Sequence, residues 1–280
     1  MENCILNNGY VLPAIGFGTY KTTTGNTADV LRTAIEAGYR YFDTASFYGN
    51  EEDIAAAVRE SGIPREKIML ASKVWKTEMG YENTKAAFAA TLKRLHTHYL
   101  DLYLIHWPKA DLQDALWRQR LIDTWEAMEE LYQDGKVRAI GVSNCLPHHL
   151  DVILDYGKIV PAVDQLEIHP GYLQKETTAF CKKNDILVQA WSPLGRSRVL
   201  QDALITELAQ KYKVSSAQLC LRFDVQYGVM PLPKASSMER MKQNLAVFDF
   251  EIDEADMEKI MNMPQTGWSG EHPDRERVAI

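Results

Sequence analysis

Four polar residues could together protonate a carbonyl oxygen while hydride is added to its carbon. They are Asp43, Tyr48, Lys73 and His106. A tyrosine hydroxyl is a weak acid with a pKa near ~10, and the ammonium of Lys73 nearby is expected to lower that pKa. Asp43 would keep Lys73 charged and oriented, and His106 would hydrogen-bond the carbonyl. The hydride must come from a cofactor, because no side chain supplies one.

The positions of these residues along the chain place them at one edge of a predicted sheet. Asp43, Lys73 and His106 each end a short apolar run, and Tyr48 lies in the loop after Asp43. Taken singly, each has a commoner structural role, as a helix cap, a solvated lysine or a turn-closing histidine. Occurring together at consecutive strand ends, the four favour a functional site.

The chain alternates short apolar runs, typical of buried strands, with longer segments of helical periodicity. The predicted strands are Ala14–Gly18, Tyr39–Asp43, Ile68–Lys73, Leu100–His106, Val137–Ser143, Val160–Glu167, Ile186–Trp191 and Val229–Leu232. Eight such units fit an α/β fold of the (β/α)8 TIM-barrel type, whose functional face lies at the carboxyl ends of the strands. The G-x-G-x-x-G fingerprint of a doubly wound dinucleotide-binding sheet is absent.

Two segments lie outside this pattern. Asn8-Gly9 within Cys4–Val11 predicts an N-terminal β-hairpin that could close the floor of the barrel. The polar stretch from Pro264 to Ile280, rich in Gly and Pro, predicts an extended C-terminal tail. No linker or low-complexity tract is present, so we expect one domain over residues 1–280.

Composition narrows the class of protein. The 280 residues include 31 Lys and Arg against 38 Asp and Glu, without a basic run, which argues against a nucleic-acid partner. No apolar stretch is long enough to span a membrane, and no N-terminal leader is apparent. Four widely spaced cysteines, without a C-x-x-C pair, indicate reduced thiols rather than a metal site. They are Cys4, Cys145, Cys181 and Cys220. We therefore expect a cytoplasmic protein without a metal.

A series of segments, in order along most of the chain, resembles the signatures of the aldo-keto reductase family. They are Gly38–Ala45, Tyr48–Glu51, Lys73–Trp75, Tyr99–Pro108, Gly135–Asn144, Gln165–Pro170, Trp191–Leu194 and Pro233–Lys234. The resemblance runs from Gly16 to about Phe250. It implies a (β/α)8 barrel, NADPH/NADP+ as cofactor, and a catalytic tetrad of Asp43, Tyr48, Lys73 and His106.

The resemblance also implies a set of cofactor-binding residues. They are Gly18, Thr19, Tyr20, Asp43, Ser143, Asn144, Gln165, Trp191, Ser192, Leu194, Gly195, Arg196, Lys234, Ser236, Ser237, Arg240, Gln243 and Asn244. Within this set, Ser143, Asn144 and Gln165 would bind the nicotinamide carboxamide, and Trp191 would stack on its ring. Residues 18–20 would lie near the ribose, and residues 192–196 would reach the pyrophosphate.

Lys234 and Arg240 resemble the family's pair for the 2′-phosphate, which favours NADPH over NADH. Three positions depart from the family pattern. Ala235 replaces a common serine, Gln243 a common glutamate, and Asp164 a common asparagine. The first two could relax the preference for NADPH, although Ser236 or Ser237 could compensate.

Aromatic residues are implied to line the substrate pocket. The implied substrate-binding residues are Tyr20, Phe47, Trp75, His106 and Trp107. Trp268 in the tail is a further candidate to cover the opening. Histidine rather than glutamate at position 106 favours reduction of C=O over C=C. The short tail is similar to the compact bacterial branch, which includes diketogluconate and glyoxal-type reductases, and the substrate is expected to be a small carbonyl compound.

Two alternatives from other classes remain at this point. Some relatives are regulatory subunits that bind NADPH with little turnover, and an intact tetrad is compatible with that role. A metal-dependent barrel hydrolase would need clustered ligands at strand ends, which His106 and His169 alone do not supply. The family default for the assembly state is a monomer.

Overall fold

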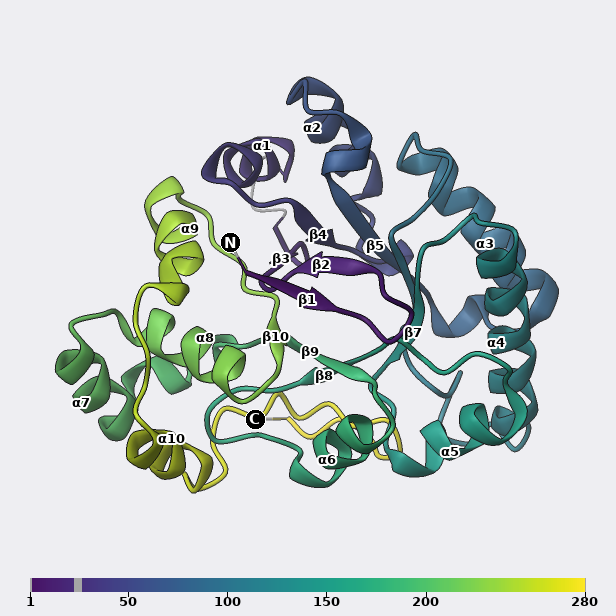
Figure 1. Ribbon diagram of the computed structural model, residues 1–280. Helices are drawn as coiled ribbons and strands as arrows, with labels where there is room; N and C mark the ends of the chain where they lie inside the picture. The colour runs from purple at the N-terminus through teal and green to yellow at the C-terminus, as the bar shows by residue number, and fades with distance from the viewer. Residues whose placement is uncertain (1, 23–26, 280) are drawn as a thin grey trace.

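A curved sheet of eight parallel strands forms the centre of the molecule (Figure 1). The computed structural model describes residues 2–22 and 27–279. Within these residues the strands lie side by side in chain order. They are β3 (Phe17–Gly18), β4 (Tyr41–Asp43), β5 (Met69–Val74), β6 (Leu102–Ile105), β7 (Ile140–Ser143), β8 (Val163–Glu167), β9 (Leu187–Trp191) and β10 (Met230–Pro231).

Two glycines allow the first and last strands to close the ring. The amides of Gly16 and Gly18 donate to the carbonyls of Pro231 and Pro233, at 3.2 and 3.1 Å. A Cβ atom on Gly18 would lie 2.9 Å from the carbonyl oxygen of Leu232, so a side chain would separate the two backbones. The predicted (β/α)8 barrel is therefore confirmed.

Helices surround the barrel (Figure 1). The α-helices are α1 (Thr27–Ala37), α2 (Glu51–Glu60), α3 (Tyr81–Arg94), α4 (Trp117–Gln133), α5 (Pro147–Tyr156), α6 (Lys175–Lys183), α7 (Ala203–Tyr212), α8 (Ser216–Gln226), α9 (Met238–Leu245) and α10 (Glu254–Met261). Short 3-10 turns are η1 (Ser46–Tyr48), η2 (Arg65–Lys67), η3 (Lys76–Glu78), η4 (Gly195–Ser197), η5 (Val199–Gln201) and η6 (Ala246–Phe248). Capping side chains set several helix starts, as Asp202 does for α7. In the described part of the chain no helix is long and apolar enough to cross a membrane.

The core has two parts. The larger part fills the layer between the sheet and the helices. The smaller part fills the inside of the barrel at the end opposite the carboxyl ends of the strands. The N-terminal hairpin of β1 (Asn3–Ile5) and β2 (Val11–Pro13) covers the latter, because Leu6 and Leu12 pack into it. Figure 1 looks onto this end, with the hairpin across the ring. The predicted hairpin is thus confirmed.

Each predicted strand overlaps an observed one; most observed strands are shorter, and β5 is shifted by one residue, from Ile68–Lys73 to Met69–Val74. The run from Ala14 to Gly18, for example, contributes only Phe17–Gly18 as strand. Most of these runs still begin with a buried residue, Val160 being the exception, and some of these residues make single bridges, as Leu100 and Val137 do. Apolar patterning reports burial, whereas ladder pairing requires a neighbouring backbone in register, and this accounts for the difference.

Candidate active site

The carboxyl ends of the barrel strands and the loops that follow them, called the rim below, carry a buried ion pair. The Lys73 ammonium, on β5, lies 2.7 Å from Asp43 Oδ2 at the end of β4 and donates to the Thr44 carbonyl at 2.8 Å. Lys73 is 0% exposed. Burial lowers the pKa of Lys73, and the carboxylate of Asp43 acts in the opposite direction. Sequence reasoning therefore paired these two residues correctly.

Tyr48 lies beside this pair, on the 3-10 turn η1 that follows β4. Its ring centroid is 5.1 Å from the Lys73 ammonium, and the Tyr20 ring packs against it at 4.9 Å. The pKa of Tyr48 is raised well above its ordinary value of 10.0, first by burial and then by the negative charge of Asp43. The expected lowering by Lys73 is wrong for this structure. The ammonium is matched by Asp43 at 2.7 Å, which leaves desolvation of the phenolate dominant.

A raised pKa keeps the Tyr48 hydroxyl protonated at neutral pH. The Tyr48 hydroxyl is then a weak acid, which gives up its proton only to an acceptor that becomes strongly basic. An alkoxide formed on a carbonyl oxygen is such an acceptor, so the geometry suits an acid that acts as hydride adds.

His106 follows β6 and completes the tetrad. Its ring lies 5.6 Å from that of Tyr48 and 4.9 Å from that of Trp75. Burial, followed by the charges of Lys73 and Lys76, holds the pKa of His106 well below its usual range. The imidazole is therefore neutral and carries one N–H donor. Among the described residues its Nδ1 has no hydrogen-bond partner.

On the opposite side of the rim, neutral side chains form a hydrogen-bonded network. Ser143 Oγ donates to the Gln165 carbonyl at 2.7 Å, and Asn144 Nδ2 donates to the His106 carbonyl at 2.9 Å. Gln165 Nε2 donates to Asp43 Oδ1 at 2.8 Å, which links the network to the ion pair. Sequence reasoning missed Gln189, whose Oε1 accepts from Gln165 at 3.1 Å. A polar residue within the apolar run Ile186–Trp191 was the available signal.

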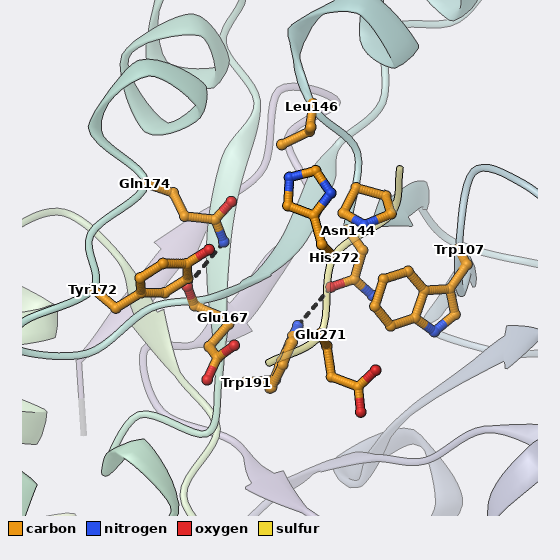
Figure 2. A pocket seen from close by; sticks show the side chains of 10 residues that line it. Trp107, Asn144, Leu146, Glu167, Tyr172, Gln174, Trp191, Glu271 and His272 are labelled. Atoms are coloured by element: carbon orange, nitrogen blue, oxygen red, sulfur yellow. Dashed lines mark hydrogen bonds between the residues drawn. The ribbon is translucent and has the colours of Figure 1, made fainter. Parts of the chain in front are cut away.

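Trp191 ends β9 beside this network. Its Nε1 donates to Asn144 Oδ1 at 2.9 Å, as Figure 2 shows. A cavity next to it is lined from the rim by Trp107, Asn144 and Trp191, and from the C-terminal tail by Glu271 and His272. The tail residues were not anticipated, since a polar, Gly- and Pro-rich stretch indicates only a loop.

The first rim loop is built around Asp43. Thr19 is buried, and its Oγ1 donates to the Asp43 carbonyl at 2.9 Å, while Asn50 Nδ2 donates to the Thr19 carbonyl at 3.0 Å. Gly18 pairs with Asp43 in the β3–β4 ladder. Tyr20 is 44% exposed and faces the opening through its contact with Tyr48. These contacts fix the backbone of residues 18–20 at the edge of the tetrad.

The loop after β9 has an unusual backbone. Ser192, Gly195 and Arg196 have φ of 50°, 52° and 53°, in the left-handed region. Gly195 packs against His169, whose Cε1 would lie 3.3 Å from a Cβ atom there. Leu194 is half-buried and Arg196 exposed. The loop is therefore held tightly on one side and presents its other side to solvent.

Positive charge collects beyond β10. Lys234 Nζ donates to the carbonyl of Lys21 at 2.9 Å and to that of Tyr20 at 3.3 Å. Partial burial and the neighbouring ammonium of Lys21 lower the pKa of Lys234. Within residues 2–22 and 27–279, neither Lys234 nor Arg240 forms an ion pair. This uncompensated charge fits a phosphate group, and Lys21 was not among the predicted residues.

The remaining predicted residues lie on or before α9 and differ in exposure. Ser236 and Ser237 are exposed, and Ser237 Oγ accepts the Arg240 amide at 3.4 Å as the helix cap. Gln243 is half-buried and donates to Glu239 at 3.4 Å, whereas Asn244 is buried on the inner face of the helix. The structure thus places these residues in one segment, with Asn244 the least accessible.

Aromatic side chains form a wall next to the tetrad. Phe47 stacks on Trp75 at 3.9 Å, and Phe47 is 52% exposed. Trp75 in turn contacts His106 edge-on. Trp107 lies on the other side, in the cavity under the tail. Trp268 does not line that cavity but stacks on Tyr172, with ring centroids 6.1 Å apart.

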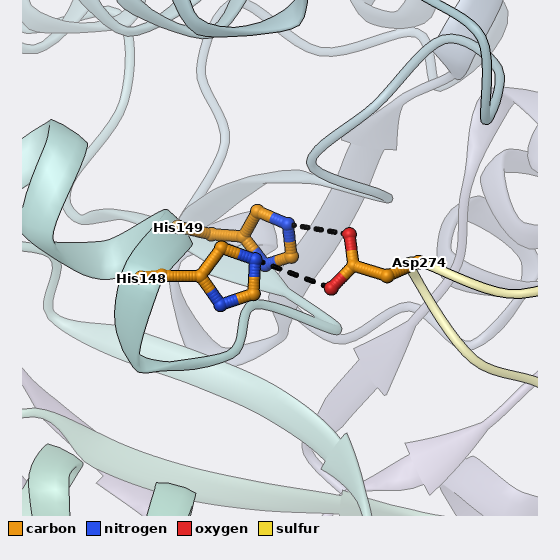
Figure 3. A group of neighbouring side chains, drawn as sticks. All are labelled: His148, His149 and Asp274. Atoms are coloured by element: carbon orange, nitrogen blue, oxygen red, sulfur yellow. Dashed lines mark hydrogen bonds and ion pairs between the residues drawn. The ribbon is translucent and has the colours of Figure 1, made fainter.

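The tail is fastened near this cavity by a cluster of two histidines and a carboxylate (Figure 3). His148 and His149 of α5 lie 3.2 and 3.1 Å from Asp274, which also pairs with Lys109. Among the described residues this set has the spacing of metal ligands. However, His149 Nδ1 accepts the Leu146 amide at 3.1 Å, so the neutral ring carries its proton on Nε2, toward Asp274.

Burial lowers the pKa of His149 to about 3, which keeps this ring neutral. Its Nε2–H then donates to Asp274 and leaves no lone pair for a metal, and the ammonium of Lys109 occupies the same carboxylate. Further along, Ser269 binds both oxygens of the buried Glu167 carboxylate. The cluster therefore acts as a hydrogen-bonded anchor for the tail.

Comparisons with known proteins, by sequence and by structure, all lead to one family. The model of the aldo/keto reductase family matches residues 14–263. Glyoxal reductase of Bacillus subtilis is 44% identical over 270 residues, covering 96% of this chain and 95% of the relative. An aldo/keto reductase structure from Brucella melitensis has a TM-score of 0.87 at 37% identity, covering 92% and 98% of the two chains. The structure of a Gox0644 mutant in complex with NADPH has a TM-score of 0.90 at 35% identity, covering 99% of each chain.

Proposed function

The chain belongs to the aldo/keto reductase family, and we propose that its rim residues carry out NADPH-dependent reduction of a carbonyl group to an alcohol as follows. Tyr48 is the proton donor, His106 orients the carbonyl oxygen, and the Lys73–Asp43 pair positions Tyr48. The observation that carries this assignment is the convergence of the other three side chains on the Tyr48 ring: Lys73 and His106 lie next to it, and Asp43 is paired with Lys73.

Reduction of the carbonyl needs a hydride, which the cofactor supplies, and a proton, which the protein supplies. Bound NADPH supplies the hydride that forms the new C–H bond. The neutral His106 imidazole donates a hydrogen bond to the carbonyl oxygen, which polarises the C=O bond and holds it near Tyr48. Negative charge then develops on this oxygen, and the Tyr48 hydroxyl transfers its proton to it. The resulting phenolate is stabilised by the ammonium of Lys73, which lies 5.1 Å from the centroid of the ring.

The residues that would hold the cofactor follow the geometry of the rim. Ser143, Asn144 and Gln165 offer both donors and acceptors, which suits the nicotinamide carboxamide. Trp191 offers a flat face at the end of β9. The residues toward the phosphates are Ser192, Leu194, Gly195 and Arg196 for the pyrophosphate and Lys234, Ser236, Ser237 and Arg240 for the 2′-phosphate.

The aromatic wall of the pocket suits small carbonyl substrates. Phe47, Trp75 and Trp107 contribute apolar faces, and hydrophobic contact discriminates weakly between shapes. The similarity to glyoxal reductase makes short aldehydes and dicarbonyls the first compounds to test. We further propose that the protein acts as a cytoplasmic monomer in which one barrel domain is the whole catalytic unit.

Spectrophotometry of NADPH oxidation tests the proposal directly. Aldehydes, ketones, dicarbonyls and keto sugars are each offered with NADPH and then with NADH. We expect turnover with short aldehydes or dicarbonyls and a preference for NADPH. Tight NADPH binding without turnover on any of these compounds would instead support the regulatory alternative, which the reductase names of the relatives do not favour.

A further inference from the structure

A fully buried carboxyl group lies directly behind the proposed carboxamide site. Asp164 precedes Gln165 on β8, and because side chains alternate along a strand it faces the opposite way, into the layer between sheet and helices. It is 0% exposed. Its Oδ1 accepts the amide N–H of Cys145 at 3.4 Å, and its Oδ2 lies 3.8 Å from the Sγ of Cys181 on α6.

The Cys145 amide is a sensitive point of the backbone. It directly follows Asn144, whose φ of 60° is in the left-handed region, which a residue other than glycine keeps when its surroundings restrain it there. The contact with Asp164 is one such restraint. It holds the turn at the Cys145 amide, away from the rim, while the Asn144 side chain of the same turn points to the rim.

The Asn144 side chain connects the residues on both sides of the rim. Its Nδ2 donates to the His106 carbonyl and to Ser143 Oγ, and its Oδ1 accepts from Trp191 Nε1. A turn that relaxes at Cys145 would therefore displace the groups that position the carboxamide and the ring-stacking tryptophan together.

The surroundings of Asp164 indicate which form of the carboxyl group is present. The titratable groups that face it are the thiols of Cys145 and Cys181, both buried and both with raised pKa values. Asp274 of the tail adds negative charge near Cys145. In the described part of the chain no cation pairs with Asp164, and burial raises its pKa well above the ordinary 3.8. In its neutral form a carboxylic acid has one acceptor, the carbonyl oxygen, and one donor, the hydroxyl. An asparagine side chain offers the same pair through its oxygen and one of its N–H groups.

From this geometry we propose that Asp164 is a positioning residue for NADPH, whose buried side chain clamps the Cys145 amide and thereby holds Asn144 in its left-handed conformation. This inference rests on the proposed contact between Asn144 and the nicotinamide carboxamide. It concerns binding of the cofactor rather than proton transfer, because Asp164 touches neither substrate nor cofactor.

Two substitutions at Asp164 separate this role from simple packing. D164N retains an oxygen that accepts the Cys145 amide N–H, and its bulk is nearly that of aspartate, so NADPH affinity should stay within about twofold of the wild type. D164L has similar bulk but no acceptor, and its Kd for NADPH should rise about tenfold, the worth of one well-placed interaction. The measurement is quenching of tryptophan fluorescence by NADPH, accompanied by kcat at saturating NADPH.

A matched control is available at Asp224 on α8, another fully buried carboxyl group, which has no partner among the described residues. D224L should leave the Kd for NADPH unchanged. A merely structural role for Asp164 would lower the melting temperature and the active fraction of D164L, and thus kcat, without raising Kd. The positioning role instead predicts a raised Kd and a kcat within about twofold of the wild type.

The outcomes are distinguishable. The inference would be overturned if D164L bound NADPH with the wild-type Kd, or if the Kd of D164N rose about tenfold. If D164L does not fold, D164A, which also lacks an acceptor for the Cys145 amide, takes its place in the comparison with D164N. N144A serves as the test of the underlying site: wild-type NADPH affinity in N144A contradicts the proposed carboxamide contact itself, whereas weak binding in N144A with normal binding in D164L contradicts only the role of Asp164.

Discussion

The two sides of the rim meet the same problem, burial of polar groups, in different ways. The side formed by β4 and β5 buries full charges, with Lys73 paired to Asp43. The side formed by β7 and β8 buries neutral groups, with Ser143, Asn144 and Gln165 joined by hydrogen bonds. A buried charge influences protonation at a distance, while neutral hydrogen bonds fix orientation. The charged side therefore suits proton transfer, and the neutral side suits positioning of a planar amide.

Loss of the acid on the charged side should have the largest effect. In Y48F the proton donor is removed and little else changes, so kcat should fall by about 10²–10⁴. The Kd for NADPH should stay near the wild-type value, because the neutral side is intact. Steady-state turnover and fluorescence titration measure the two quantities. Y103F removes a buried hydroxyl group elsewhere and is the control; a Y48F variant as active as Y103F would refute the assignment of the acid.

Breaking the ion pair should primarily cost stability. K73M leaves the Asp43 carboxylate buried without its cation, which is expected to cost about 3–5 kcal/mol in the free energy of unfolding. Chemical denaturation measures this. The double variant D43N/K73M removes both charges and should recover most of the stability while turnover stays low. Equal stability of the single and double variants would show that the pair is not the source of the effect.

Removing the positive charge beyond β10 should alter cofactor choice without disturbing either side of the rim. In K234M/R240M we expect the KM for NADPH to rise by at least about tenfold, because charge-assisted contacts to a phosphate are lost. The KM for NADH should change little. K242M, on the same helix, is a control for surface charge. An equal rise for both cofactors would contradict the assignment of the 2′-phosphate site.

The smallest effect concerns acid pH. The pKa of His106 is held well below the ordinary 6.5, so the imidazole stays neutral and kcat should remain level as the pH falls through about 6.5. Stability should behave differently. The unfolded chain takes up a proton on His106 below about 6.5 while the folded chain does not, so the free energy of unfolding should decrease as the pH falls. A pH–rate profile with a step near 6.5 would place the histidine outside the desolvated site.

The sequence was sufficient to place those residues whose position depends only on where a strand ends. Asp43, Lys73 and His106 could be assigned to one rim because each ends an apolar run, and parallel strands bring their carboxyl ends to one edge. Lys234 and Arg240 were proposed for the 2′-phosphate from the family resemblance, and the structure places both in the segment that follows β10. Lys21 and Gln189 were missed, because a basic loop residue and a polar residue within a strand are each common without function.

What the amino-acid sequence determined by itself is the barrel and the set of side chains at its rim, since both follow from the order and spacing of apolar runs. What only the tertiary structure decided is the state of those side chains. The raised pKa of Tyr48, the neutral His106 and the cover formed by the tail depend on burial and on groups distant in the chain. Desolvation is a property of the packed interior, and residue type and spacing alone do not contain it.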